Sequence, residues 1–443
     1  MRLHPKTSVV RKTTLGTKFV IFLLCGFIII GKPFVYIAFA LAGLLVALQP
    51  RVLVHRVYRG LTMPGPLSGF TWALVLSTMY GMAGFVYGLV TGSPLLTAIE
   101  VLAFNFCPWF IFFGVYAGKE WPVLARQYVR LLFWSQAIMT PVYFLFFRHI
   151  RLPWAEGDLL VPGSGALLVL GIFCFEKNLI RSWFPLLVCS FDTIAAEIRG
   201  DWVGLGMALL IWAISTKRLA RMACAVGVLI ALLLLGFLTD LRLPPLPGRG
   251  GEISARDTVG RALSPINHEL AEEYSSNAKM YAGTVQWRQI WWKAIREAVF
   301  EKPNTTIFGL GYGYPIKDLR SSLRNTDIRS PHSVFYFTLA YSGMTGVLMF
   351  AFLQLQLLRL LWRVYKETGE IFGFTCLIFL IGTSLFGNFF ESPQRSIPPY
   401  ILLGMCIGPL LVKREMVDRA SLWRGRTYPS VLPTNQTVAC LAE

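Results

Sequence analysis

Long apolar blocks alternate with short polar segments along most of the chain, and Lys/Arg or Pro/Gly residues bound each block. A helix needs about 20 apolar residues to cross the hydrocarbon core of a bilayer. The pattern therefore predicts an all-α polytopic membrane protein with about twelve transmembrane helices. Whether the first two, which are short, both cross the membrane stays open. The expected spans lie near residues 19–31, 34–49, 68–90, 95–117, 127–147, 160–175, 179–196, 201–216, 220–239, 332–358, 372–390 and 397–412.

The composition agrees with this fold class. Hydrophobic residues make up 55% of the chain and charged residues 15%, whereas soluble domains contain about 25% charged residues. Seven of the eight cysteines lie in apolar blocks, one lies in the C-terminal tail, and none lies in the long polar segment 240–331. This distribution excludes a disulfide-stapled domain in that segment, and no CxxC pair indicates a metal site. We expect no metal and no cofactor.

Basic residues gather in every second loop. A net charge of +18 would suggest nucleic acid as a partner of a soluble protein, but here the positive-inside rule accounts for most of it. One of these basic loops contains Arg51, Arg56 and Arg59. Both termini are basic as well, and the alternate short loops carry little charge. We therefore expect a multi-pass protein of the bacterial inner membrane with cytoplasmic N- and C-termini and no nucleic-acid partner.

This topology divides the chain into four parts. Residues 1–239 hold the first nine spans, 240–331 form one large periplasmic loop with short helices between helices 9 and 10, 332–412 hold the last three spans, and 413–443 form a cytoplasmic tail. The segment Phe19–Gly31 resembles a signal peptide, but no cleavage site follows it, so we expect a retained span. No internal repeat is visible and the long loop comes late, which disfavours a two-half transporter.

The loop contains a predicted amphipathic helix at about residues 284–300. At 100° per residue, its polar side holds Gln286, Gln289, Lys293, Arg296 and Glu297, and its apolar side holds Val285, Trp291, Trp292, Ile295 and Val299. Arg288 falls on the apolar side. One interpretation is an interfacial helix with a snorkelling arginine; the other is an anion clamp, because a guanidinium matches phosphate oxygens bidentately.

Two further features complete the loop. The segment Phe308–Tyr314 carries three alternate glycines, for which a tight turn is favoured over a phosphate cradle, since no strand–helix context surrounds them.

At the end of the loop, Ser330 is a plausible N-cap and Pro331 fits the first position of the tenth span. His332 would then lie in the first helical turn, where the helix dipole keeps it neutral and able to act as a base. An interfacial histidine that only caps the span is the alternative.

Charged residues also stand in short outer loops and within one span. Arg199 follows the seventh span with almost no extramembrane length, so it must lie at the outer membrane face. Glu391 and Arg395 bracket Pro393 between the last two spans. Asp192 lies inside the seventh span, where a carboxylate is a functional candidate, although pairing with a neighbouring arginine to hold the bundle together is favoured.

These residues resemble a known family. A basic residue after the seventh span (Arg199), an Arg-x-x-x-Trp helix (Arg288 and Trp292), a Gly-rich turn, and then His332 with Leu339, Gly343 and Gly346 are similar to the O-antigen ligase and O-antigen polymerase superfamily. The resemblance extends over most of the chain, and its diagnostic part is roughly residues 190–350. Two positions depart from the family pattern: Ile198 stands where Ser often precedes the arginine, and Ser333 where Asn often follows the histidine.

The resemblance implies a GT-C-like fold and a metal-independent glycosyltransferase. Such enzymes transfer a glycan from undecaprenyl diphosphate to an acceptor, either lipid A core or growing polysaccharide, at the periplasmic face. Carried over, Arg199 and Arg288 would bind the diphosphate and His332 would act on the acceptor hydroxyl. Further basic residues could supplement or replace either arginine, and Trp292 would line the substrate site. The basic candidates are Arg148, Arg151, Arg320, Arg324, Arg329 and Arg395.

Two alternatives stay open beside ligase and polymerase. A protein O-oligosaccharyltransferase would use the same donor with a different acceptor. A flippase or polysaccharide exporter would need a charged path through the bundle. Intramembrane charges are few, chiefly Asp192 and Glu100, and the basic groups concentrate at the outer face, which favours chemistry at that face.

Overall fold

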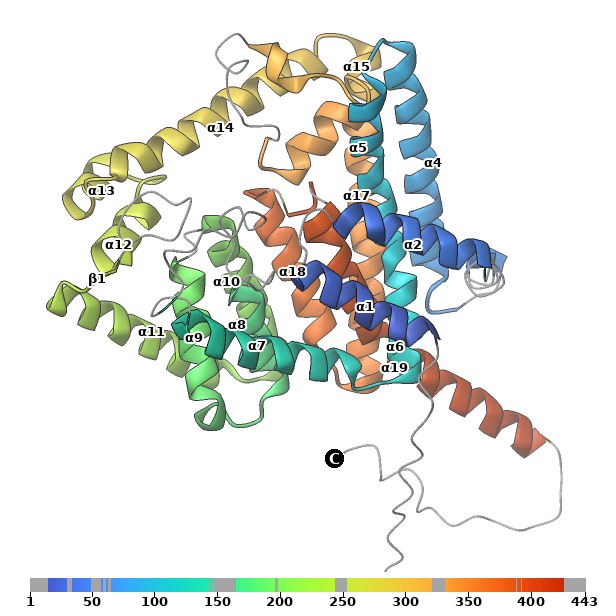
Figure 1. The fold of residues 1–443 in the computed structure, drawn as a ribbon, viewed down its shortest axis with the longest axis horizontal. Helices are drawn as coiled ribbons and strands as arrows, with labels where there is room; N and C mark the ends of the chain where they lie inside the picture. Colours follow the sequence, from blue (N-terminus) through green and yellow to red (C-terminus); the bar gives the residue numbers. More distant parts are fainter. Residues whose placement is uncertain are drawn as a thin grey trace, which may run out of the picture.

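A computed structural model describes residues 15–29, 34–48, 57–58, 61–62, 65–142, 146, 165–195, 198–243, 253–320, 331–387, 389–391 and 393–425. The described chain is predominantly α-helical (Figure 1). Within it, five helical segments are long and apolar enough to cross a membrane: Ser68–Val90, Leu95–Glu120, Leu219–Thr239, Val334–Thr368 and Pro393–Val417. Shorter apolar helices occupy Thr17–Gly26, Phe34–Ala47, Gly165–Phe175 and Phe372–Leu385. The expected class, an all-α membrane protein, agrees with this content.

Each of the twelve apolar segments coincides with helical structure. The first nine are α1 (Leu15–Ile29), α2 (Phe34–Leu48), α4 (Ser68–Val90), α5 to α6 (Leu95–Phe106, η1 Cys107–Phe110 and Ile111–Glu120), α7 (Leu124–Val142), α8 (Gly165–Phe175), α9 (Trp183–Ala195, after η3 Ile180–Ser182), α10 (Arg199–Thr216) and α11 (Leu219–Thr239). The last three are α17 (Val334–Thr368), α18 (Phe372–Leu385) and α19 (Pro393–Gly425). Helices α17 and α19 extend ten or more residues beyond the predicted spans. The spans were predicted from apolar stretches alone, and both helices continue into the polar residues that follow.

Glycines bring the helices close together. A Cβ atom on Gly204 of α10 would lie 2.6 Å from the carbonyl oxygen of Phe379 in α18, and one on Gly200 would lie 2.8 Å from that of Thr383. Helices α6 and α19 meet in the same way, with Gly114 and Gly118 on one side and Gly404 and Gly408 on the other. Helices in lipid gain stability from such close van der Waals packing. The contact between α10 and α18 places the N-terminus of α10 beside the C-terminus of α18.

The described part of the long loop contains short helices beside the one that was located from the sequence. A short antiparallel pair, β1 (Arg242–Leu243) and β2 (Ile253–Ser254), is followed by α12 (Ala255–Leu263), α13 (His268–Tyr274), α14 (Ala278–Val299), α15 (Pro303–Phe308) and η4 (Ile316–Leu319). Short helices were expected in this loop, but only the one at 284–300 was located from the sequence; α12 and α13 were not located, and α14 begins earlier than predicted. Helix α14 runs across one end of the bundle, from α13 to α15 (Figure 1).

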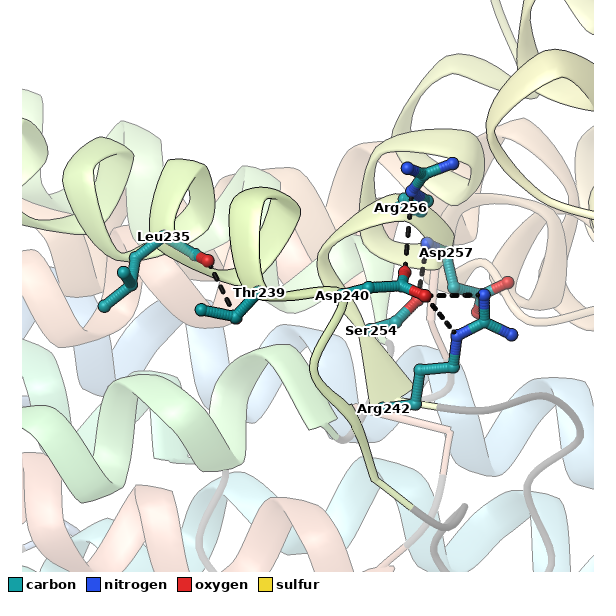
Figure 2. A network of polar contacts seen from close by, with 7 residues as sticks. All are labelled: Leu235, Thr239, Asp240, Arg242, Ser254, Arg256 and Asp257. Atoms are coloured by element: carbon teal, nitrogen blue, oxygen red, sulfur yellow. Dashed lines mark hydrogen bonds and ion pairs between the residues drawn. The ribbon is translucent and has the colours of Figure 1, made fainter.

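A polar network fixes the start of this loop (Figure 2). Asp240 ends α11 in the left-handed conformation, with φ of 44°. Its carboxylate accepts a hydrogen bond from Nη2 of Arg242 at 2.9 Å and pairs with Nε of Arg256 at 3.6 Å. The hydroxyl of Ser254 accepts a hydrogen bond from the backbone N–H of Asp257 at 3.0 Å, which caps α12. The end of α11 is thereby tied to the first helix of the loop.

The Gly-rich segment forms a turn, as expected, and packs against a break in α17. Gly343 interrupts the helical backbone of α17 with φ of 61°, and the N–H of Leu310 donates to the carbonyl of Ala340 at 2.7 Å. A Cβ atom on Gly309 would lie 2.6 Å from the backbone nitrogen of Gly343. The glycines therefore permit close backbone approach, and the segment locks the first part of α17, Val334–Ser342, in place.

Candidate functional site

Arg288 points from α14 toward the helix bundle. It shares a face with Trp291, Ile295 and Val299, which are fully buried, and it is itself half-buried. Its Nη1 donates to the carbonyl oxygen of Phe386 at 3.0 Å, at the C-terminus of α18. A helix C-terminus carries partial negative charge, which suits a guanidinium. The predicted placement of Arg288 on the inward face of the helix is confirmed.

His332 lies outside the helix that was expected to contain it. Helix α17 begins at Val334 with Ser333 as its N-cap, and His332 has φ of 53°. The prediction of Pro331 as the first helical residue is therefore wrong, and Ser330 lies outside the described residues. The reason is a tertiary contact: the indole Nε1 of Trp292 donates to the carbonyl of Pro331 at 2.9 Å. A non-glycine residue with positive φ is uncommon, and such strain is frequent at functional sites.

The imidazole of His332 is held neutral. Burial, and after it the positive charges of Arg288 and Arg395, together lower the pKa of His332 to about 4. The expected neutral histidine is confirmed, but its cause is burial beside two arginines and not the dipole of a helix that contains it. The ring centroid lies 6.1 Å from that of Trp287, in an edge-to-face arrangement.

Glu391 approaches the same histidine from the turn between α18 and α19. Burial raises the pKa of Glu391 well above its ordinary value, while the backbone N–H groups of Ser333 and His332 and the charge of Arg288 act in the opposite direction. Both carboxylate oxygens are buried, and the two N–H groups lie close enough to favour the ionised form of this carboxyl group. In the sequence, Glu391 is only a charge in a short loop, and no local pattern marks it as part of this site.

Arg199 is the first residue of α10 and is half-buried. The next residue, Gly200, packs against the carbonyl of Thr383, near the C-terminus of α18 that Arg288 binds at Phe386. The two arginines that the resemblance assigns to the diphosphate thus approach one helix end from α10 and α14. Arg395, in the first turn of α19, acts on the pKa of His332. Arg329 lies outside the described residues, as do Arg148, Arg151 and Arg324.

The side chain of Trp292, which was expected to line the substrate site, contacts Tyr336 and Pro331. Its indole stacks on Tyr336 with ring centroids 4.7 Å apart and an interplanar angle of 9°, and its N–H is bound to Pro331. These contacts position the segment that carries His332. Trp287, one turn earlier, was not singled out from the sequence, but its ring lies beside that of His332 and its indole nitrogen is buried without a hydrogen bond to a described residue.

Two further candidates, Asp192 and Arg320, have contacts with other elements. Asp192 is buried in α9, where a Cβ atom on Gly165 of α8 would lie 2.7 Å from its Oδ2. Arg320 is half-exposed and donates to a carboxylate oxygen of Glu297 on the outward face of α14, at 3.1 Å. Among the described residues, no group of three His, Cys, Asp or Glu side chains could hold a metal ion.

Buried polar groups without partners are rare in folded proteins, and several occur here within the described chain. They include Nε1 of Trp287, both carboxylate oxygens of Glu391 and Oε1 of Gln394, and others lie elsewhere in the molecule, such as Oε1 of Gln136 and Oε1 of Gln354. With Arg288, Arg395 and the neutral imidazole of His332, the site offers cationic donors, a neutral base and a carboxyl group. Such a set suits an anionic ligand beside a hydroxyl group that loses a proton.

Comparisons with family models and with curated proteins identify no relative of this chain. No model of a protein family matches the chain, and no curated protein is significantly similar to it. The inference of function therefore rests on the side chains around His332 and on the helices that bring them together.

Proposed function

We propose that this protein is a membrane glycosyltransferase of the O-antigen ligase or polysaccharide polymerase type. It transfers a glycan from undecaprenyl diphosphate to an acceptor hydroxyl at the periplasmic face of the inner membrane. The observation that carries the proposal is that Arg288 and Arg395 both lie close enough to lower the pKa of the partly buried His332, while Arg288 is oriented by its bond to Phe386. The resemblance of the Arg199, Arg288 and His332 motifs to that superfamily agrees with it.

The proposal includes the membrane topology. Twelve spans with cytoplasmic termini place α14 and the turn between α18 and α19 at the periplasmic face. Five helical segments within the described chain have the length and apolarity of full spans, and the shorter apolar helices would supplement them. The basic loops at Arg51–Arg59 and at Arg359–Lys366 would then face the cytoplasm, as the positive-inside rule requires.

In the proposed reaction, the acceptor hydroxyl attacks the anomeric carbon of the lipid-linked sugar. A bond forms between the acceptor oxygen and the anomeric carbon, and the bond from that carbon to the diphosphate oxygen breaks. The diphosphate leaves with the electron pair, and Arg199 and Arg288 stabilise its charge. His332, neutral at physiological pH, helps to remove the proton of the acceptor hydroxyl. One displacement inverts the configuration at the anomeric carbon.

Arginine is suited to this role for a physical reason. Its planar guanidinium presents paired N–H donors that match two phosphate oxygens at once. In the described structure, Arg288 uses Nη1 for a hydrogen bond to Phe386, which orients the group and leaves its other donors for a ligand. Such preorganised donors stabilise the charge that develops on a leaving group, because they need not reorient during the reaction.

The test is complementation of a deletion strain. His332→Ala and Arg288→Ala, each present at normal membrane level, are expected to abolish surface glycan. Arg296→Ala is the matched control, because Arg296 is an exposed arginine on the opposite face of α14 and should retain activity. Full activity of both the His332 and Arg288 variants would overturn the assignment. In the deletion strain, polymer that accumulates on the lipid carrier and is missing from lipid A core indicates a ligase, and single-repeat capping indicates a polymerase.

A further inference from the structure

Residues 303–316 contain no charged side chain, although charged residues stand directly on both sides of them. Glu301 and Lys302 precede this segment, and Lys317 and Asp318 follow it. The segment comprises α15 and the Gly-rich turn. An apolar stretch of about 10–14 residues is too short to cross a bilayer as a helix, but it suits a segment that enters the bilayer and returns to the same side.

The contacts with α4 give the depth of this segment, and Figure 1 shows α15 beside the ends of α4 and α5. The backbone N–H of Tyr312 donates to the carbonyl of Gly84 at 3.5 Å, and a Cβ atom on Gly88 would lie 2.2 Å from the carbonyl oxygen of Tyr312. Gly84 precedes the end of α4 at Val90 by six residues, which is about 9 Å along the helix axis. Since α4 has the length of a full span, this contact lies inside the span.

Helices α5 and α17 give a similar depth. The amide Nδ2 of Asn105, ten residues after the start of α5, donates to the hydroxyl of Tyr312 at 2.7 Å. The carbonyl of Ala340, six residues after the start of α17, accepts from the N–H of Leu310 at 2.7 Å. Both helices belong to segments that are long and apolar enough to cross a membrane. Residues 303–316 therefore pack among three spans, below their ends.

The backbone of the segment meets the condition that a bilayer imposes. Lipid offers no hydrogen-bond partner, so non-helical backbone at membrane depth must be buried in protein and bonded there. Residues 309–313 are buried or half-buried. The N–H of Gly309 donates to the carbonyl of Thr305 at 2.8 Å, and the carbonyl of Ile307 accepts from the hydroxyl of Tyr80 at 3.1 Å.

Two apolar side chains of the segment have exposed surface at this depth. Ile307 is 46% and Phe308 is 45% exposed, and the Phe308 ring lies 6.1 Å from that of Tyr87 in α4. Val90 and Leu96, at the tip of the α4–α5 hairpin, are 80% and 73% exposed. Apolar surface in water is unfavourable, so the exposed apolar tip indicates that hydrocarbon reaches it. Ile307 and Phe308 contact α4 below that tip.

We propose that residues 303–316 form a re-entrant segment, which enters the bilayer on the side of the candidate site and returns to that side. Its outward surface, at Ile307 and Phe308, binds the acyl chains of the lipids. This inference goes beyond the proposed function, because it concerns where the loop lies and not what reaction it serves. For the proposed reaction, it places the site at the level of the lipid headgroups, where a lipid-linked diphosphate resides.

The experiment measures depth in liposomes of phosphatidylethanolamine and phosphatidylglycerol. A fluorescent amino acid is incorporated into the full-length protein at Ile307 or at Phe308, and spin-labelled lipids carry the quencher on the headgroup or near the top of the acyl chain. The same probe at Val86, an exposed position of α4, is the standard for membrane depth, and at Glu301 it is the standard for the interface. We expect the acyl-chain label to quench Ile307 and Phe308 at least about twofold more strongly than the headgroup label, as at Val86.

The opposite result overturns the proposal. If both positions are quenched as Glu301 is, by the headgroup label and by iodide in the water, the segment lies outside the hydrocarbon. The unfolding temperature shows whether each labelled protein keeps its fold.

A second measurement needs no substitution. In the wild type, lipids with a photoreactive group near the top of the acyl chain should label Ile307 and Phe308 but not Lys293 and Glu297, on the exposed face of α14. Labelling of Val86 without Ile307 and Phe308 overturns the proposal. Neither measurement involves glycan transfer, so an inactive wild type would contradict the proposed function alone.

Discussion

The indole N–H of Trp292 donates a hydrogen bond to the carbonyl oxygen of Pro331, with 2.9 Å between nitrogen and oxygen. This bond joins α14 to the residue directly before His332, and the Trp292 ring stacks on Tyr336 in the first turn of α17. The backbone at His332 is held at φ of 53°, a conformation that other contacts must enforce. The position of the imidazole therefore depends on a side chain four residues after Arg288.

Trp292→Phe tests this dependence. Phenylalanine keeps an aromatic ring that can stack on Tyr336 but removes the N–H donor, so the segment at Pro331 loses its anchor. We expect transfer to fall about 10- to 100-fold, since a displacement of about 1 Å in a catalytic group can cost that much. Trp72→Phe removes a comparable N–H bond, to the carbonyl of Leu61 near the start of α4, and should leave transfer unchanged. Equal rates in the two variants would contradict the positioning role of Trp292.

Arg288→Lys tests whether donor binding requires the planar shape of the guanidinium group or only its positive charge. Lysine keeps the positive charge but lacks the planar fork that can bind Phe386 and two phosphate oxygens together. We expect donor binding to weaken at least about 10-fold in a direct binding assay, with the protein inserted normally. Arg296→Lys on the exposed face of the same helix controls for the substitution itself. Wild-type affinity in Arg288→Lys would mean that the site requires only a charge at this position.

The sequence predicted the helices of the bundle well because burial in lipid imposes long apolar stretches, as in α4 and α11. Short helices were expected in the long loop, but α12 and α13 were not located, because their residues are mostly polar and no apolar period marks them. Their N-caps are visible in hindsight: Ser254 and Asn267 each accept a hydrogen bond from a backbone N–H at the start of the helix. Capping signals alone were too local to reveal helices in a polar loop.

The candidate site was predictable only where one helix determines the geometry. The inward direction of Arg288 follows from the helical period of α14. The start of α17 was placed too early because Ser330-Pro331 is a local N-cap pattern, whereas the bond from Trp292 to Pro331 joins segments 39 residues apart. Glu391 could not be found from the sequence, because its surroundings exist only where α14, α17 and the turn before α19 meet.

Gly343→Ala is expected to destabilise the protein and to reduce transfer. The residue has φ of 61°, and an added Cβ would lie 2.5 Å from the carbonyl oxygen of Ile307. With ψ of −164° this backbone lies in a region that is essentially restricted to glycine, and it costs another residue about 1–3 kcal/mol before any clash is counted. Gly227→Ala in α11, where an added Cβ meets nothing within 4 Å, is the control and should not destabilise. The check is the unfolding temperature in detergent, together with transfer, because the displaced segment Val334–Ser342 begins two residues after His332.

Acidification should destabilise the protein partly through His332. The pKa of His332 is about 4 in the folded state and about 6.5 in an unfolded chain. Between these values the unfolded state binds more protons, so the free energy of unfolding decreases as pH falls from about 6.5 to 4. His332→Gln removes this titration and should show a smaller decrease over the same window, while other groups contribute equally to both proteins. The unfolding temperatures of the two proteins in detergent, measured from pH 7.5 to 4.5, give the difference directly. Parallel curves would show that His332 does not titrate between those pKa values, and would contradict its burial as a neutral imidazole between Arg288 and Arg395.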